Sequence, residues 1–260
     1  MERIRKLKEF FKDKRPLKKL GQNFLICRNI LDKIVETAEI TKEDTILEIG
    51  AGLGFLTEEL AKKAKKVIAV EKDSRLIGYL KNNLPKNVTV KEKDILKMTP
   101  LKGDYKVAAN LPYYITSPII KKLLENNPPS LIVLTVQREI GERICAHPPQ
   151  MSKLAVFTQF HSKPEIITKV PKSCFWPQPK VDSVILKLTP KKVKESKSFS
   201  RIVKAGFSHP RKQLVKNLSQ NLEIDSKIVE KKLKELGINS KQRAETLSLK
   251  DWKSLVNLLE

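Results

Sequence analysis

The sequence predicts an α/β fold, with an open, mostly parallel sheet of seven strands followed by a small all-helical domain. Short apolar runs with strand composition alternate with helical periodicity over residues 45–146. That alternation is typical of right-handed βαβ units with helices on both faces of the sheet. Beyond residue 200 only helical patterns recur. A chain of 260 residues is long enough for one good-sized domain and a small second one.

Each element follows from its local pattern. Residues 1–20 form a basic, partly helical arm, and residues 29–40 place apolar side chains at helical spacing. Apolar runs predict strands over 45–54 (ending in a glycine turn), 66–73, 87–94, 105–110 and 130–137. Helical periodicity predicts helices over 55–64, 74–84, 117–126 and 138–146. Ser74 and Ser117 are the expected N-caps of two of these helices.

The remainder of the chain sets the domain boundaries. Two further strands, over 164–170 and 181–188, are joined by a short loop and predict a hairpin that closes one edge of the sheet. We therefore expect a first domain over 1–190 that includes the basic arm. A linker over 191–200 and a helical domain over 201–260 are expected to follow.

The charge balance indicates a polyanionic partner. The formal net charge is +23, and such a basic excess most often serves nucleic-acid binding. A lysine-rich solvated surface is the alternative, but such surfaces usually balance lysine with glutamate, and that balance is missing here. No apolar run approaches the roughly 18 residues of a membrane helix, so we expect no membrane association and a cytoplasmic location. Cys27, Cys145 and Cys174 show neither a disulfide framework nor zinc-ligand spacing, and we expect no metal site and a reducing, intracellular setting.

A glycine turn and three acidic residues predict a nucleoside pocket. In open parallel sheets ligands bind beyond the carboxyl ends of the strands. Gly50 and Gly52 follow Glu48 at the end of the first predicted sheet strand, where glycine lets the backbone approach a ligand closely. Glu71 ends the second strand and can accept both ribose hydroxyls, while Asp94 ends the third and can accept from an adenine amino group. An adenosine without a ribose phosphate suggests S-adenosylmethionine as the cofactor.

The stretch 110–113, Asn-Leu-Pro-Tyr, ends the fourth strand, where a methyl acceptor would lie. The Asn110 carbonyl oxygen and a backbone carbonyl of the Leu111–Pro112 turn can each accept one hydrogen of an exocyclic amine. This arrangement aims the nitrogen lone pair at a sulfonium methyl group. Tyr113 offers a face for the base, which must be unpaired or flipped out to reach it. A strand-ending turn with packing tyrosines is the structural alternative.

Six blocks together resemble a known family. They are GQNFL (21–25), LEIGAGLG (47–54), NLPYYITSP (110–118), FWPQPKVDS (175–183), FSHPRKQL (207–214) and RAETLS (243–248). The chain resembles the rRNA adenine dimethyltransferases of the KsgA type from about residue 16 to its end. The resemblance implies a Rossmann-like class I S-adenosylmethionine-dependent methyltransferase fold. It further implies N6,N6-dimethylation of two adjacent adenosines in the 3′-terminal hairpin loop of small-subunit rRNA, in small-subunit biogenesis.

The resemblance also implies residue roles. Gln22, Asn23 and Leu25 would border the methionine part of the cofactor, and Phe175 would stack on the target base opposite Tyr113. Core packing is the rival role for Phe175. Candidate phosphate contacts are Lys18, Lys19, Arg211, Lys212 and Lys216. The expected partner is an immature small ribosomal subunit, with the protein a monomer when free.

Three other functions stay open. The antibiotic-resistance methyltransferases of large-subunit rRNA share the Asn-[Ile/Leu]-Pro-Tyr block, although the C-terminal blocks favour the small-subunit enzyme. A DNA adenine methyltransferase is the second alternative, since charge and motif do not separate RNA from DNA. A ribosome-assembly binding factor with weak catalysis is the third, and the intact block at 110–113 opposes it.

Overall fold

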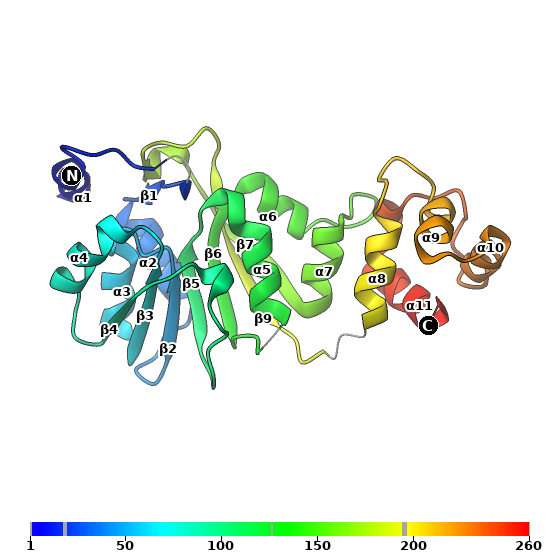
Figure 1. Ribbon diagram of the computed structural model, residues 1–260, viewed down its shortest axis with the longest axis horizontal. Helices are drawn as coiled ribbons and strands as arrows, with labels where there is room; N and C mark the ends of the chain where they lie inside the picture. The colour runs from blue at the N-terminus through cyan, green and yellow to red at the C-terminus, as the bar shows by residue number, and fades with distance from the viewer. Residues whose placement is uncertain (1, 18–19, 126, 194–196, 260) are drawn as a thin grey trace. The chain divides into compact units, whose positions relative to one another are not determined.

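A computed structural model describes residues 2–17, 20–125, 127–193 and 197–259 of the chain (Figure 1). The strands are β1 (Phe24–Leu25), β2 (Thr45–Ile49), β3 (Lys66–Glu71), β4 (Val88–Glu92), β5 (Lys106–Asn110), β6 (Leu131–Gln137), β7 (Ser162–Val170), β8 (Phe175–Trp176) and β9 (Ser183–Pro190). The α-helices are α1 (Glu2–Phe10), α2 (Arg28–Thr37), α3 (Phe55–Lys63), α4 (Ser74–Asn83), α5 (Thr116–Glu125), α6 (Arg138–Ile144), α7 (Lys153–His161), α8 (Lys197–Gly206), α9 (Leu214–Leu222), α10 (Ser226–Glu235) and α11 (Leu249–Leu259).

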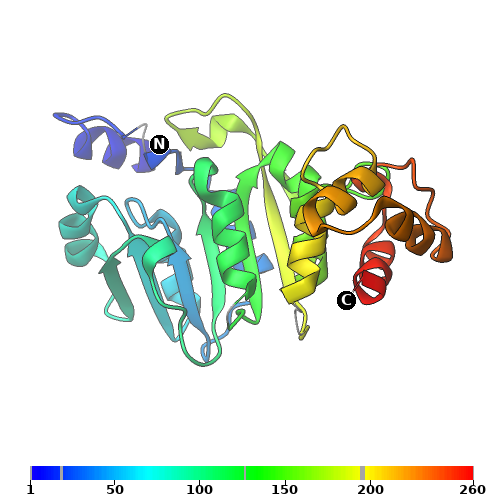
Figure 2. The same cartoon turned by 45° about the vertical axis from the view of Figure 1, so that its right-hand side comes forward.

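The main sheet has seven strands in the order β4-β3-β2-β5-β6-β9-β7 (Figures 1 and 2). Strands β2 to β6 pair in parallel, whereas β9 pairs antiparallel to β6. The chain winds outward from β2 to β4 and then returns to the other side of β2 as β5. The strand order therefore reverses between β2 and β5, and the carboxyl ends there form the crevice where such sheets bind ligands. The predicted fold class, including the edge hairpin, is confirmed.

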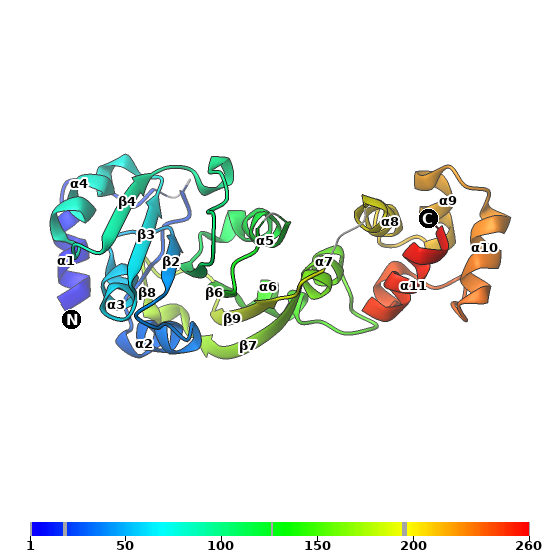
Figure 3. The ribbon, with the colours of Figure 1, turned by 90° about the horizontal axis from the view of Figure 1, so that it is seen from below.

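Helices cover both faces of this sheet. One core cluster combines side chains of α2, α3 and α4 with alternate strand residues such as Ile46. Leu47, the next residue of β2, faces the other side and lies near Leu123 of α5. Figure 3 shows α5 on one side of the sheet and α2 and α3 on the other. The apolar runs of the central strands are therefore explained by burial on both faces.

A second, two-stranded sheet was not predicted. Strands β1 and β8 pair antiparallel, with Phe24 opposite Trp176 and Leu25 opposite Phe175. The Ile26 backbone N–H extends the pairing by donating to the Cys174 carbonyl at 2.9 Å. Two-residue strands have no periodicity for a sequence analysis to detect.

Both serine N-cap predictions were wrong. The N-cap of α4 is Asp73, whose carboxylate accepts from the Arg75 backbone N–H at 3.2 Å, so Ser74 is the first helical residue. Helix α5 begins at Thr116, which places Ser117 inside its first turn. In α4 the cap lies one residue earlier than predicted because the Asp73 carboxylate reaches an exposed backbone donor.

The described residues form two compact units. The first comprises Met1–Gly141 and Pro164–Pro190, and the second comprises Glu142–Lys163 and Lys191–Glu260. The sequence analysis placed residues 142–163 in the first domain, but α7 packs with the C-terminal helices. Phe160 of α7 stacks on Phe199 of α8 at 3.9 Å between ring centroids, within the core of the second unit. The predicted linker also contains the start of α8. None of the described helices is long and apolar enough to cross a membrane.

Candidate active site

A pocket that is open to solvent lies at the carboxyl ends of β2, β3 and β5. We call it the strand-end pocket. Its lining residues are Leu20, Gly21, Gln22, Asn23, Phe24, Ile49, Gly50, Gly52, Val70, Glu71, Lys72, Lys93, Asp94, Ile95, Asn110, Leu111, Pro112, Tyr114 and Ile115. The structure thus brings together most residues that the sequence analysis assigned to the cofactor. The position agrees with the strand-order reversal between β2 and β5.

The glycine turn after β2 forms one wall. Gly50 and Gly52 have φ values of 77° and 61°, a region that other residues rarely adopt. A Cβ atom on Gly52 would lie 3.0 Å from the Phe24 ring. Glycine is therefore required both by backbone conformation and by the close approach of residue 24.

Glu71 is held by the backbone around it. Its carboxylate accepts from the backbone N–H groups of Gly52 at 2.9 Å and of Lys72 and Asp73 at 2.8 Å each. Burial raises the pKa of Glu71, and these three hydrogen bonds oppose the rise. The side chain is fixed at the pocket wall, with both lone pairs of Oε1 taken by backbone donors and one lone pair of Oε2 left as an acceptor.

Asp94 forms an ion pair inside the pocket. Lys72 Nζ lies 2.9 Å from Asp94 Oδ2, while Oδ1 accepts from the Leu96 backbone N–H at 3.0 Å. The hydrogen bond from Lys72 lowers the pKa of Asp94, so the carboxylate remains ionised as an acceptor. Sequence analysis missed Lys72, because nothing in its local pattern distinguishes it from the other lysines.

Glu48 lies beneath the glycine turn rather than in the strand-end pocket. It is 1% exposed and lines a smaller cavity together with Leu25, Gly50, Gly52 and Asn110. Burial raises its pKa to about 8, and the nearby Glu71 carboxylate acts in the same direction. Within the described part of the chain its Oε2 atom has no hydrogen-bond partner.

The N-terminal residues 20–24 form another wall of the strand-end pocket. The Gln22 side chain accepts from the Leu17 backbone N–H at 2.7 Å and donates to Asp73 Oδ2 at 2.8 Å. Asp73 also pairs with Arg75, whose hydrogen bond lowers the Asp73 pKa. Leu25 is buried in β1 and lines the smaller cavity rather than the strand-end pocket.

Asn110 is the last residue of β5, and of its two side-chain polar atoms only the nitrogen is hydrogen-bonded within the described structure. Its Nδ2 donates to the Asn23 carbonyl at 2.9 Å, which ties the N-terminal segment to the sheet edge. Its Oδ1 is buried and has no hydrogen-bond partner among the described residues. A buried acceptor without a partner is costly, which favours a site that a ligand donor completes. Leu111 and Pro112 continue the pocket wall beside it.

The two proposed stacking residues differ in their surroundings. Tyr113 is half-buried, does not line the strand-end pocket in the described structure, and shares a 2.8 Å hydrogen bond with Ser183 Oγ. Phe175 is 3% exposed and belongs to the same core cluster as Phe24. Core packing accounts for Phe175 here, and a stacking role would require its ring to be uncovered. That role stays a prediction.

Tyr114 is a pocket residue that the sequence analysis did not select. Its side chain is 54% exposed and lines the strand-end pocket, next to Gly21. The adjacent tyrosines occupy a single 3-10 turn, Tyr113–Ile115, where consecutive side chains point in different directions. Sequence alone did not show which tyrosine faces the pocket.

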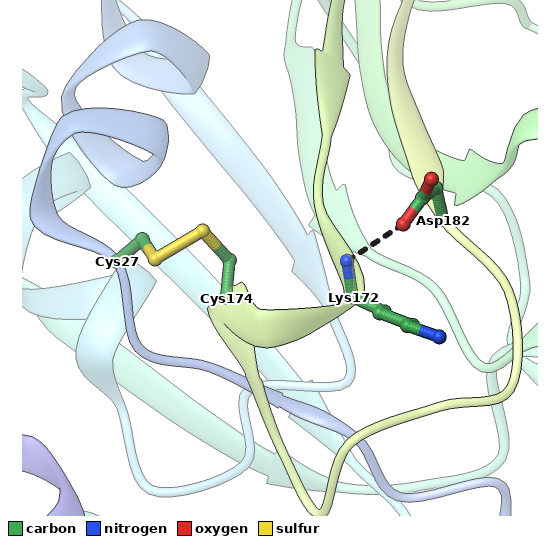
Figure 4. Close-up of a disulfide and its surroundings, with 4 residues drawn as sticks. All are labelled: Cys27, Lys172, Cys174 and Asp182. Atoms are coloured by element: carbon green, nitrogen blue, oxygen red, sulfur yellow. Dashed lines mark hydrogen bonds between the residues drawn. A yellow bond between two sulfur atoms is a disulfide. The ribbon is translucent and has the colours of Figure 1, made fainter.

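The absence of a disulfide was predicted incorrectly. Cys27, just before α2, and Cys174, just before β8, form a disulfide (Figure 4). They are 147 residues apart in the chain, so no local sequence pattern predicts that they pair. Pairing of β1 with β8 brings them together and joins the N-terminal segment to the strand that carries Phe175.

The predicted phosphate-binding lysines and arginine divide into two sets. Lys18 and Lys19 lie outside the described residues. Arg211, Lys212 and Lys216 are exposed in the second unit, before and within α9. The described residues contain no group of three or more metal-binding side chains.

Comparisons with known proteins agree with this geometry. The family model for ribosomal RNA adenine dimethylase matches residues 14–260. The chain is 43% identical to ribosomal RNA small subunit methyltransferase A of Bacillus mycoides, over 93% of this chain and 90% of that protein. It is 42% identical to the protein of the same name from Bacillus pumilus, over 94% of this chain and 91% of that protein.

Two solved structures share the fold over most of the chain. A dimethyladenosine transferase from Plasmodium falciparum superposes with a TM-score of 0.77 at 32% identity, covering 89% of this chain and 95% of that one. The 23S rRNA methyltransferase ErmE superposes with a TM-score of 0.75 at 28% identity, covering 91% and 99%. The chain therefore belongs to the ribosomal RNA adenine dimethylase family and is a methyltransferase with S-adenosylmethionine as its methyl donor.

Proposed function

We propose that this protein dimethylates the N6 amino groups of two adjacent adenosines in the 3′-terminal hairpin loop of small-subunit rRNA. The observation that carries the proposal is the buried, unpartnered Oδ1 of Asn110 at the edge of the strand-end pocket. An oxygen in that position accepts one hydrogen of an adenine amine. Its orientation is supported by the hydrogen bond from Nδ2 to the Asn23 carbonyl.

The residues present fit the methyl donor. Glu71 would hold the ribose, Asp94 the adenine amine, and the turn at Gly50 and Gly52 would approach the cofactor by its backbone. Glu48, Gln22, Asn23 and Leu25 would border the methionine part, either directly or from the smaller cavity. When bound, S-adenosylmethionine supplies a methyl group activated by a positively charged sulfur.

The protein's own residues then position the acceptor. Asn110 Oδ1 and the Leu111 backbone carbonyl accept the two amine hydrogens, which turns the nitrogen lone pair away from the ring and toward the methyl group. Pro112 restricts the backbone of this turn. Tyr113 offers its ring to the flipped base, and Phe175 remains a second candidate. Each transfer would form a C–N bond as the S–CH3 bond of the donor breaks to leave a neutral thioether, and the methylated nitrogen would release one proton to water. Because that cationic nitrogen is acidic, alignment and fixed dipoles suffice without a strong base.

Sequence similarity favours the small subunit as the source of the substrate. Identity is 43% to a relative named for the small subunit and 28% to the 23S rRNA methyltransferase. The fold does not separate the two, since the TM-scores with the dimethyladenosine transferase and the 23S enzyme are 0.77 and 0.75. The exposed Arg211, Lys212 and Lys216, with Lys18 and Lys19, would contact phosphates of an immature small subunit. We propose that the free protein is a monomer.

Incubation with separated ribosomal subunits and labelled methyl donor tests the proposal. Mass-spectrometric mapping should find dimethyladenosine at two neighbouring positions near the 3′ end of small-subunit rRNA. Label confined to large-subunit rRNA would establish the large-subunit alternative. RNA binding without any label transfer would establish a binding factor.

A further inference from the structure

Ser183 holds the hydroxyl of Tyr113. Ser183 is the first residue of β9 and is fully buried, and its Oγ lies 2.8 Å from the Tyr113 hydroxyl oxygen. Strand β9 pairs with β6, and Ser183 lies opposite Gln137. Strand β6 in turn pairs with β5, which ends at Asn110. The serine therefore reaches the Asn110–Tyr113 block across a neighbouring strand, although it is 70 residues away in sequence.

The backbone around Ser183 is fixed independently of Tyr113. The Asp182 carbonyl accepts from the Arg138 backbone N–H at 3.0 Å. The Asp182 carboxylate accepts from the Lys172 backbone N–H, also at 3.0 Å (Figure 4). Strand pairing holds the next residue, Val184, opposite Val136. Ser183 Oγ is consequently held in place by contacts that do not involve Tyr113.

Tyr113 needs such an attachment. It lies in a single 3-10 turn, and its backbone carbonyl accepts from Thr116 Oγ1 at 3.3 Å. These contacts place the backbone but leave rotation about two side-chain bonds. The ring is only half-buried, and its hydroxyl end meets a fully buried serine. Burial raises the pKa of Tyr113, so the phenol stays protonated at neutral pH and retains this hydrogen bond.

We propose that Ser183 is a positioning residue that fixes the plane of the Tyr113 ring for stacking on the target adenine. This inference rests on the proposed function, in which Tyr113 contacts the flipped base. Ser183 lines neither the strand-end pocket nor the smaller cavity, and it would act through the tyrosine hydroxyl. Replacing either end of the hydrogen bond therefore has the same consequence for the substrate.

The test is a double-mutant cycle on Ser183→Ala and Tyr113→Phe with small-subunit particles as substrate. Each single variant should lower kcat/KM for the RNA about tenfold. A loss of that size lies within the free energy that stacking of one base on an aromatic ring contributes. The double variant should lose no more than either single variant, because both changes remove one interaction. Affinity for S-adenosylmethionine, measured by calorimetry, should change less than twofold.

Two further comparisons separate positioning from general destabilisation. Ser183→Thr keeps a hydroxyl, whereas Ser183→Val introduces a side chain of almost the same shape as threonine but without the hydroxyl. The threonine variant should therefore be several-fold more active than the valine variant. Ser162→Ala removes another fully buried serine hydroxyl, which bonds the Thr158 carbonyl at 2.7 Å. That variant should lose thermal stability but keep the kinetic constants.

The possible failures are distinguishable. Additive losses in the cycle, or equal activity of the threonine and valine variants, would overturn the role of Ser183 while leaving the proposed function intact. A fully active Tyr113→Ala variant would remove Tyr113 from the base site and the inference with it. If Ser183→Ala does not fold, Tyr113→Phe removes the same hydrogen bond, and its unchanged kcat/KM would overturn the inference. A wild-type protein that methylates no small-subunit rRNA would instead refute the proposed function.

Discussion

The side-chain nitrogen of Asn110 donates a 2.9 Å hydrogen bond to the backbone carbonyl of Asn23. This bond connects the end of β5 to the N-terminal segment that lines the strand-end pocket. It also fixes the orientation of the amide, since Nδ2 is already used and Oδ1 remains as a buried acceptor. The acceptor geometry and the position of this pocket wall thus depend on one residue.

Replacing Asn110 with alanine should lower methyl transfer about 100-fold, the scale seen when one preorganised polar group is lost from a reacting centre. Affinity for S-adenosylmethionine should fall less than tenfold, because the other pocket walls remain. Single-turnover kinetics and calorimetry measure the two effects. The control is Asn87→Ala, which removes a different side-chain amide bonded to the Ala61 and Ala64 carbonyls. It should reduce stability only, and unchanged turnover in the Asn110 variant would remove that residue from the site.

Replacing Glu71 with glutamine should weaken both the protein and its cofactor complex. A glutamine has one acceptor oxygen for three backbone donors, and each unsatisfied buried N–H costs about 1–3 kcal/mol. We expect a lower thermal midpoint and about tenfold weaker S-adenosylmethionine binding. A tenfold change corresponds to the loss of about one hydrogen bond to the ribose. Glu92→Gln, opposite Glu71 on β4 but exposed, should change neither quantity. Equal cofactor affinity would refute the ribose role of Glu71.

Stability should fall as pH rises toward 8, because the folded state raises the pKa of Glu48 from its usual 4.5 to about 8. Between these values the folded protein keeps a proton that the unfolded chain releases. The contribution of Glu48 is fully present below pH 4.5 and is lost as pH passes through 8. Urea unfolding at a series of pH values should show this decline, and Glu48→Gln should make it shallower, leaving the part that the raised pKa of Glu71 contributes in the same direction. Parallel curves for the two proteins would show that Glu48 is not buried as a neutral acid.

Reducing the Cys27–Cys174 disulfide should lower the free energy of unfolding. The bond closes a loop with a sequence separation of 147 residues, for which chain-entropy arguments give at most about 5 kcal/mol. Denaturant unfolding with and without a thiol reductant measures the difference. Cys145→Ala should respond to reductant as the wild type does, whereas Cys27→Ser should no longer respond. A wild type that is insensitive to reductant would show that the bond does not stabilise the fold.

Binding to rRNA should weaken steeply as salt increases, because phosphate contacts release counterions. The logarithm of the association constant should fall linearly with the logarithm of salt concentration, and Arg211→Ala should reduce the slope by about one unit. Lys231, also exposed but on α10, provides a matched control whose alanine variant should keep the wild-type slope. A flat salt response would contradict the proposed use of the basic surface.

The amino-acid sequence by itself determined the order of strands and helices along the chain and the sheet edge at which the candidate site lies. Apolar periodicity is a local property, and β2 to β6 and the helices between them were predicted to within a few residues. The glycine turn at Gly50 and the ends of β3 and β5 were also evident, because parallel strands must all end at one edge of the sheet.

Only the tertiary structure decided contacts between distant segments. The pairing of Cys27 with Cys174, the attachment of Tyr113 to Ser183 and the burial of Phe175 all join segments that are distant in sequence. No local pattern specifies such partners, since they meet only when strand pairing and packing place them together. Desolvation likewise depends on everything packed around a group, so the sequence named Glu48 as a candidate but did not show that it would be held as a neutral acid.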